Sequence, residues 1–193
     1  MPRGQNKEKL LEHGAELLYS GGFHATGVQE IADAAGVPKG SFYNYFESKT
    51  DFALTVLGGY TDQACQMLEQ ALLRSEGTPL TRLRRFYADN IAQIEESGEL
   101  CGCLLGNFCQ EMAGKDDLFR QAVDAAMTRT RWYFTECLKQ AQAAGEISAS
   151  HDPDQLARFL VASWQGALTR VKADRGVGPL RDFEHVVFEL ALN

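Results

Sequence analysis

A chain of 193 residues that is 45% hydrophobic and 23% charged has the composition of an ordinary globular protein, long enough for one or two domains. No apolar run approaches the length of a membrane span, and the first residues lack the apolar core of a signal peptide, so we expect a cytoplasmic protein. The net charge of −7 argues against strong non-specific binding to nucleic acid, although a few well-placed groups can still recognise it specifically.

The hydrophobic pattern predicts an all-α fold, since few segments alternate with a period of two and Pro and Gly fall between helical stretches. The first helix is expected from about Asn6 to Tyr19. Residues 26–49 then predict a helix, a sharp turn at Gly36 and Val37, and a second short helix. This is the layout of a helix-turn-helix, whose second helix enters the major groove of DNA.

The first helix of this motif carries an apolar stripe at helical spacing, formed by Val28, Ile31, Ala32 and Ala35. Thr26 lies just before the stripe, where its hydroxyl can cap the helix, and Glu30 places a negative charge in the first turn. Gly36 suits the left-handed residue that ends this helix, and Pro38 suits the first turn of the next one.

The second helix has an expected core side and an expected polar side. Phe42 and Phe46 are four residues apart and are expected in the core. Gly40 lets the backbone approach a phosphate, and Lys49 follows at the start of another helix, where its ammonium can hold one. The polar side carries groups that hydrogen-bond base edges or phosphates, namely Lys39, Ser41, Tyr43, Asn44 and Tyr45. Two ordinary helices with an exposed polar face would give the same pattern.

Residues 7–60 resemble the DNA-binding domain of the TetR family of bacterial repressors. The matching elements are GGFHATGVQEIADAAGV, then PKGSFYNYF, then ESKTDF. The resemblance implies a domain over residues 1–48 that binds a double-stranded DNA operator, and it adds Gln29 as a contact. The expected DNA-contacting residues are therefore Thr26, Gln29, Lys39, Gly40, Ser41, Tyr43, Asn44, Tyr45 and Lys49.

Residues 49–193 are expected to form a second helical domain that begins with a linking helix over 49–74. We expect this domain to bind a ligand and to form the dimer. Further helices are expected at about 79–96, 101–112, 116–144, 153–173 and 180–192. The last two are unusually apolar along one side, and in the TetR family the last two helices form a four-helix dimer interface. The expected interface residues, which plain intramolecular core would also explain, are Leu156, Phe159, Leu160, Ser163, Ala167, Val171, Phe183, Val186, Val187 and Leu190.

The cysteines number five, and an odd count without a secretion signal argues against a disulfide framework. Three of them lie in CGCLLGNFCQEM without a histidine, which argues against a metal site, and no cofactor is expected. Buried, inert thiols are the commoner state. The stretch GCLLGNF, however, resembles the corresponding helix of the NemR-like branch of TetR regulators. That resemblance implies a sensor of electrophiles or oxidants at Cys103, with Cys101 and Cys109 as neighbouring candidates.

The other expected effector is a small organic molecule held between helices of the second domain. Binding there would change the separation of two DNA-binding motifs and weaken their hold on a pseudo-palindromic operator. The candidate pocket residues, most of which plain core would also explain, are Phe86, Tyr87, Phe108, Met112, Met127, Trp132, Tyr133 and Trp164.

An enzyme and a carrier protein are the competing classes. A thiol enzyme needs a base beside its cysteine, but none of the four histidines shares a recognisable motif with one. The chain also has no phosphate-cradling glycine loop, no HExxH and no GxSxG. A carrier would leave the motif unexplained. We therefore expect a homodimeric transcriptional repressor with no enzymatic activity, and repression is the default of the family.

Overall fold

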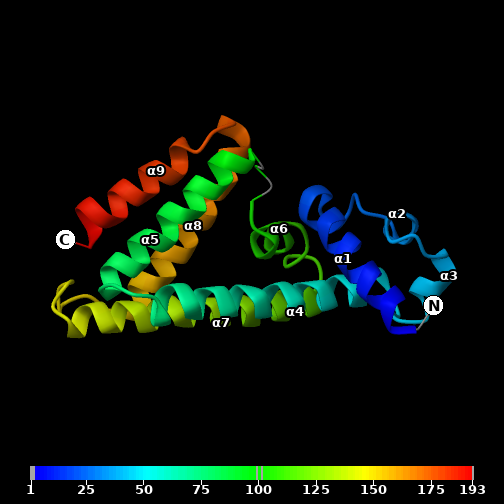
Figure 1. The fold of residues 1–193 in the computed structure, drawn as a ribbon, viewed down its shortest axis with the longest axis horizontal. Helices are drawn as coiled ribbons and strands as arrows, with labels where there is room; N and C mark the ends of the chain where they lie inside the picture. Colours follow the sequence, from blue (N-terminus) through cyan, green and yellow to red (C-terminus); the bar gives the residue numbers. More distant parts are fainter. Residues whose placement is uncertain (1–2, 99, 101, 193) are drawn as a thin grey trace. The chain divides into compact units, whose positions relative to one another are not determined.

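The computed structural model describes residues 3–98, 100 and 102–192, and every regular element in those residues is helical (Figure 1). The all-α fold class predicted from the sequence is confirmed, with a helix-turn-helix near the N-terminus followed by further helices. None of the described helices is both long and apolar enough to cross a membrane.

The chain divides into two compact units, each discontinuous in sequence. The first contains the residues up to Asp62 and Cys103–Ala126, and the second contains Gln63–Gly102 and the residues from Met127 onward. The first unit holds α1 (Arg3–Gly21), α2 (Val28–Ala34), α3 (Lys39–Phe42), most of α4 (Lys49–Leu68), α6 (Leu104–Glu111) and the first turns of α7 (Asp117–Ala143). The second holds the rest of α4 and α7, the π-helical turn η1 (Glu69–Arg74), α5 (Pro79–Ser97), α8 (Pro153–Asp174), α9 (Gly178–His185) and the π-helical turn η2 (Val186–Ala191).

The predicted helices all occur, with bounds that differ by a few residues. The linking helix expected over 49–74 is α4 continued by η1. The helix expected over 101–112 begins only at Leu104, because Cys103 has extended backbone angles, with φ −117° and ψ 133°. The helix expected over 180–192 begins at Gly178 and widens into η2 at Val186.

The core of the first unit forms where α1, α2, α3 and α4 meet. The rings of Phe42, Phe46 and Phe52 cluster with centroids 4.9 to 5.4 Å apart, and Phe42 is 0% exposed. Helix α1 can approach α4 closely because Gly14 has no side chain, since a Cβ there would lie 2.3 Å from the Phe52 ring. The expected core positions of Phe42 and Phe46 are confirmed.

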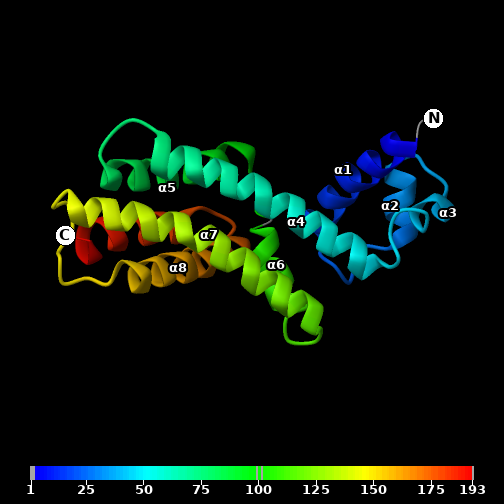
Figure 2. The ribbon, with the colours of Figure 1, turned by 90° about the horizontal axis from the view of Figure 1, so that it is seen from below.

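The core of the second unit is an aromatic cluster to which α5, α7, α8, α9 and η2 contribute. Tyr87 lies in the middle, with ring centroids 4.9 Å from Trp164, 4.8 Å from Phe183 and 6.0 Å from Phe134. Helix α9 packs along α8 and α5 (Figures 1 and 2). Two exposed ion pairs join it and η2 to α5: Arg181 lies 2.8 Å from both carboxylate oxygens of Glu95, and Arg84 lies 2.7 Å from Glu189.

Candidate nucleic-acid interface

The turn between α2 and α3 has the geometry that the sequence predicts. Gly36 has φ +65°, in the left-handed region, and the N–H groups of Gly36 and Val37 donate to Asp33 and Ala32 at 3.1 and 2.9 Å. These two bonds form a Schellman motif, which ends α2 and satisfies its last carbonyls. The turn therefore sets where α3 begins.

Helix α3 has one buried residue, Phe42, and its polar side chains lie towards solvent. Phe42 is fully buried, whereas Tyr43 is 55% exposed. Hydrogen-bonded turns continue to Phe46, whose N–H donates to the Phe42 carbonyl at 3.1 Å. Among residues 39–45, two of those expected to contact DNA are half-buried, namely Ser41 and Tyr45. The others are exposed, namely Lys39, Gly40, Tyr43 and Asn44.

Helix α2 carries Gln29, another residue expected to contact DNA. Its side chain is exposed, and a hydrogen bond to Asp33 orients its carboxamide. Its Nε2 donates to the Asp33 Oδ1 at 2.7 Å. Glu30 reaches back to the start of the helix, where its Oε2 accepts the N–H of Gly27 at 3.3 Å. The exposed face of α2 therefore carries two carboxylates as well as Gln29.

The cap predicted for α2 is wrong. The N-cap residue is Gly27, and Thr26 is only 3% exposed. The Thr26 hydroxyl points inward and donates to the carbonyls of Gly22 and Leu17 at 2.8 and 3.2 Å. A DNA contact by Thr26 stays a prediction, and in this conformation its hydroxyl is not available to make one.

Lys49 begins α4 as expected, but its ammonium is engaged within the protein. The Nζ donates to the carbonyls of Phe23 and Thr26 at 2.8 and 3.0 Å and lies 4.2 Å from the centre of the Phe23 ring. Lys49 thus fastens the turn that precedes α2. Its expected phosphate contact stays a prediction, and it would have to be made alongside these bonds or in their place.

Glu111, which the sequence did not suggest as a functional residue, reaches the same turn from α6. Its Oε2 accepts the N–H groups of Phe23 and His24 at 2.9 and 3.2 Å. Phe23 also meets Phe119 of α7 edge to face at 5.2 Å, and Phe119 meets Phe108 of α6 at 5.3 Å. Figure 2 shows α6 beside the first turns of α7.

The four described cysteines differ in exposure. Cys103 and Cys109 are half-buried, whereas Cys65 and Cys137 are buried. Burial raises the pKa of Cys137 to about 11, so its thiol stays protonated near neutral pH. The Cys103 Sγ lies 3.4 Å from the Tyr60 hydroxyl, and burial together with this thiol raises the pKa of Tyr60. The candidate Cys101 lies outside the described residues.

The residues expected to line an effector pocket are divided between the two units. Phe108 and Met112 belong to the first unit, and the remaining candidates belong to the second. Trp132 is 51% exposed, while Tyr133 and Trp164 pack against the core around Tyr87. Tyr87 is fully buried, and its hydroxyl has no hydrogen-bond partner among the residues that the structure describes. Burial is also the main reason why the pKa of Tyr87 is raised.

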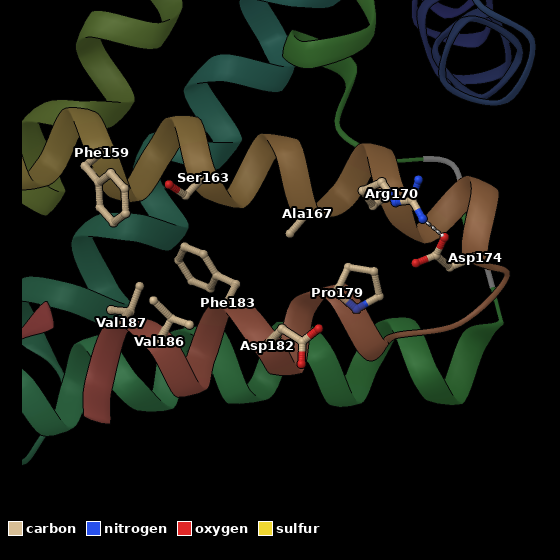
Figure 3. Close-up of a pocket in the computed structure, with 10 residues that line it drawn as sticks. All are labelled: Phe159, Ser163, Ala167, Arg170, Asp174, Pro179, Asp182, Phe183, Val186 and Val187. Carbon is tan, nitrogen blue, oxygen red and sulfur yellow. Dashed lines mark hydrogen bonds and ion pairs between the residues drawn. The ribbon is translucent and has the colours of Figure 1, made fainter. Parts of the chain in front are cut away.

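An open groove of about 530 Å³ runs between α8 and the segment formed by α9 and η2 (Figure 3). Six of the predicted interface residues line it, namely Phe159, Ser163, Ala167, Phe183, Val186 and Val187. One end also contains charged groups, where Arg170 pairs with Asp174. Phe159 of α8 and Val186 of η2, which both line the groove, are 48% and 44% exposed, and Leu190 of η2 is 68% exposed.

Several of the predicted interface residues, including two that line the groove, are buried in the core of their own unit. Leu160, Val171, Phe183 and Val187 are 7% exposed or less, so they form part of the core of their own unit. Leu156 packs against the same core. The exposed and half-buried members of the predicted set offer surface to a second molecule in this conformation.

Two family models match most of the chain. Residues 6–56 match the model described as bacterial regulatory proteins, tetR family. Residues 79–187 match the model described as a tetracyclin repressor-like C-terminal domain. The first match covers α2 and α3, and the second covers α5 to α9.

Individual proteins match over nearly the whole chain. The transcriptional regulator AcuR of Cereibacter sphaeroides is 39% identical over 176 residues, covering 91% of this chain and 80% of AcuR. The transcriptional repressor DhaR of a Mycobacterium species is 36% identical over 192 residues, covering 100% of this chain and 95% of DhaR. The crystal structure of a regulatory protein TetR from Rhodobacter sphaeroides has a TM-score of 0.86 at 38% identity, covering 93% and 95% of the two chains. Reduced NemR of Escherichia coli has a TM-score of 0.89 at 29% identity, covering 97% and 98%.

Proposed function

This chain belongs to the TetR family of DNA-binding transcriptional regulators, and we propose that it is a repressor released from a pseudo-palindromic operator by a small effector molecule. The similar proteins DhaR and NemR are named repressors, which supports this sign of regulation. The similar proteins are regulators and not enzymes, in agreement with the expectation from the sequence. A cytoplasmic location belongs to the proposal, because a repressor must reach chromosomal DNA.

The exposed polar face of α3 carries this proposal. Phe42 anchors the helix in the core, while Lys39 and Asn44 face solvent with hydrogen-bonding groups that suit phosphates and base edges. Apart from its chain neighbours and the backbone of its own helix, no described atom lies within 4 Å of the position where a Cβ of Gly40 would stand, so a phosphate can approach the backbone there. This combination of a rigid anchor and a short polar surface suits insertion into the major groove.

The direct test is selection of bound duplexes from a random DNA pool with the purified, reduced protein. We expect enrichment of a two-fold-symmetric site. Asn44→Ala should weaken binding to that site by about tenfold, the size of one lost base contact. Gln93→Ala, at an exposed position of α5 in the second unit, is the matched control and should bind normally. Failure to enrich any sequence with folded protein would refute the proposal.

The operator affinity should depend only shallowly on salt. Acidic side chains outnumber basic ones in residues 1–50, and the Lys49 ammonium is already bonded to two carbonyls. We therefore expect the dimer to neutralise no more than about six phosphates, as measured by the slope of affinity against salt concentration. A much steeper slope would contradict this part of the proposal.

A homodimer that meets along the exposed apolar side of α8, α9 and η2 is part of the same proposal. The exposed side chains of Phe159, Val186 and Leu190 support it, since such patches commonly mark protein interfaces. Light scattering should give twice the mass of the chain, and Leu190→Glu should reduce the mass towards that of a monomer. Leu118→Glu changes a leucine of similar exposure in the first unit and should leave the dimer intact. A monomeric wild-type protein would rule the dimer out.

The buried hydroxyl of Tyr87 supports effector binding in the second unit. A hydroxyl without an acceptor in an aromatic interior is unfavourable, so a ligand that supplies an acceptor would be bound there preferentially. We therefore propose an effector that is small, largely apolar and able to accept one hydrogen bond. Compounds that release the selected duplex should lose potency against Tyr87→Phe and keep it against Trp132→Phe, at an exposed position. Equal potency against both variants would place the effector elsewhere.

A thiol-based sensor is the second candidate, and the contact between Tyr60 and Cys103 favours it. The Tyr60 hydroxyl lies 3.4 Å from the Cys103 sulfur and can donate a hydrogen bond to it. Release of the selected duplex by an electrophile should then disappear in Cys103→Ser and persist in Cys109→Ser. An unchanged response of Cys103→Ser would exclude this candidate.

A further inference from the structure

The turn between α1 and α2 is held by two side chains of opposite charge from two other helices. Glu111, the last residue of α6, accepts two backbone N–H groups of this turn. Lys49, the first residue of α4, donates to two of its backbone carbonyls. Hydrogen bonds to charged groups are shorter and stronger than neutral ones, so these two residues fix where the turn lies. Helix α2 begins two residues after Thr26, and its direction follows from the turn.

The Glu111 carboxylate fits closely against the turn. Gly22 has φ +82°, and a Cβ at this position would lie 2.2 Å from Oε1 and 3.0 Å from Cδ of Glu111. The backbone therefore approaches the carboxylate at a place that no side chain could occupy without a shift. The Phe23 ring connects to α6 a second time, through Phe119 and Phe108. Both routes tie the same turn to one helix.

We propose that Glu111 is a positioning residue for operator binding: through its two hydrogen bonds, α6 sets the orientation of the helix-turn-helix. This inference rests on the proposed function as a DNA-binding repressor. Glu111 would touch no DNA itself. Any shift of α6 that withdrew the carboxylate would leave two N–H groups without their acceptor and would disfavour the arrangement that binds the operator.

The sign of the charge makes this proposal testable. DNA is a polyanion, so removal of a negative charge near it should by itself strengthen binding. Positioning predicts the opposite for Glu111→Gln, because the neutral amide is a weaker acceptor for the two N–H groups. Asp124→Asn removes the same charge from an exposed position of α7 in the same unit, and it serves as the matched control.

The experiment uses the full-length protein and the duplex that the wild type selects from a random pool. We expect Glu111→Gln to bind it about tenfold more weakly, the effect of losing roughly one charge-assisted hydrogen bond. Asp124→Asn should bind as tightly as the wild type or more tightly. The salt dependence of Glu111→Gln should match that of the wild type, since no phosphate contact is lost. A variant that lost a direct phosphate contact would show a shallower slope, and that result would overturn the proposal.

A second measurement separates positioning from a general loss of folding. Circular dichroism should show the same helix content for Glu111→Gln and the wild type, and backbone amide NMR signals of the free proteins are then compared. We expect changes at residues 22–26 that continue along α2, and changes confined to α6 would overturn the proposal. Equal operator affinity of Glu111→Gln and wild type would overturn it while leaving the proposed function intact. A wild-type protein that selects no duplex would overturn both.

Discussion

The turn between α1 and α2 and the aromatic interior of the second unit are held by different forces. The turn is held by directional bonds, since its backbone groups are bonded to Glu111, Lys49 and the Thr26 hydroxyl. The interior around Tyr87 is held by ring contacts, which have no strict geometry, and its one central hydroxyl lacks a described partner. Directional bonds specify one arrangement of the turn, whereas packing alone fixes the aromatic interior less strictly.

The largest effect is expected where the turn tolerates no side chain. Gly22→Ala should lower the free energy of unfolding by about 3 kcal/mol, because it combines a left-handed backbone with an overlap against Glu111. Gly21→Ala is the control, since a Cβ there would only touch the Thr26 hydroxyl at 3.4 Å. Urea denaturation measures both. Equal stability of the two variants would show that the turn is less constrained than its contacts indicate.

Removal of the Lys49 ammonium should have the next largest effect. Lys49→Met loses two charge-assisted hydrogen bonds to the turn, and we expect a loss of about 2 kcal/mol in the free energy of unfolding. Lys9→Met, at an exposed position of α1, should change stability by less than about 0.5 kcal/mol. The same variants decide whether Lys49 also contacts phosphate, because a lost contact would reduce the salt slope of operator binding by about 1.

A smaller effect of opposite sign is expected in the aromatic interior. Tyr87→Phe removes the hydroxyl that lacks a described partner and keeps the ring, so it should raise the free energy of unfolding by about 1 kcal/mol. Thermal denaturation of the free protein measures this change. A destabilised Tyr87→Phe would mean that the hydroxyl does have a partner in solution, and the contrast between the two regions would then fail.

The smallest effect concerns pH. The Cys137 thiol has a pKa of about 11 in the folded chain and an ordinary value of 9.0, so between these values the folded state keeps a proton that the unfolded state releases. Rising pH therefore favours unfolding, by less than about 1 kcal/mol up to about pH 9.5. Urea midpoints at pH 7.5 and 9.5 should differ less in Cys137→Ala than in the wild type. An identical pH dependence in both proteins would assign the effect to other groups.

Local features of the helix-turn-helix could be predicted from the sequence. Gly36 and the spacing of Phe42 and Phe46 involve residues that are close in the chain, and periodicity reports such contacts well. Thr26 shows where this fails: a threonine before a helix is typical of a cap, but tertiary contacts turned its hydroxyl inward. The helix expected to begin at Cys101 failed for a similar reason, since backbone conformation at Cys103 is not visible in a hydrophobic pattern.

Long-range contacts could not be predicted. Glu111 is 88 residues from Phe23, and its only visible signal was a carboxylate at the end of the otherwise uncharged helix α6. The hydrogen bonds of Lys49 to backbone carbonyls could not be predicted either, because an ammonium at the start of a helix can donate equally well to a phosphate or to a carbonyl. Packing also decides which residues of the last helices face the core of their own unit. The sequence predicted ten interface residues without distinguishing them, and only their exposure in the structure shows which ones are buried.

The discontinuous make-up of the first unit has a consequence for protein engineering. Chimeric regulators are naturally built by joining one protein's DNA-binding segment to another's sensor at a single point near the start of α4. In this chain such a junction would leave behind Glu111, Phe108 and Phe119, which complete the first unit from residues 103–126. A working hybrid would have to carry these residues together with the motif, or match them in the recipient, so the smallest exchangeable module has two pieces of chain.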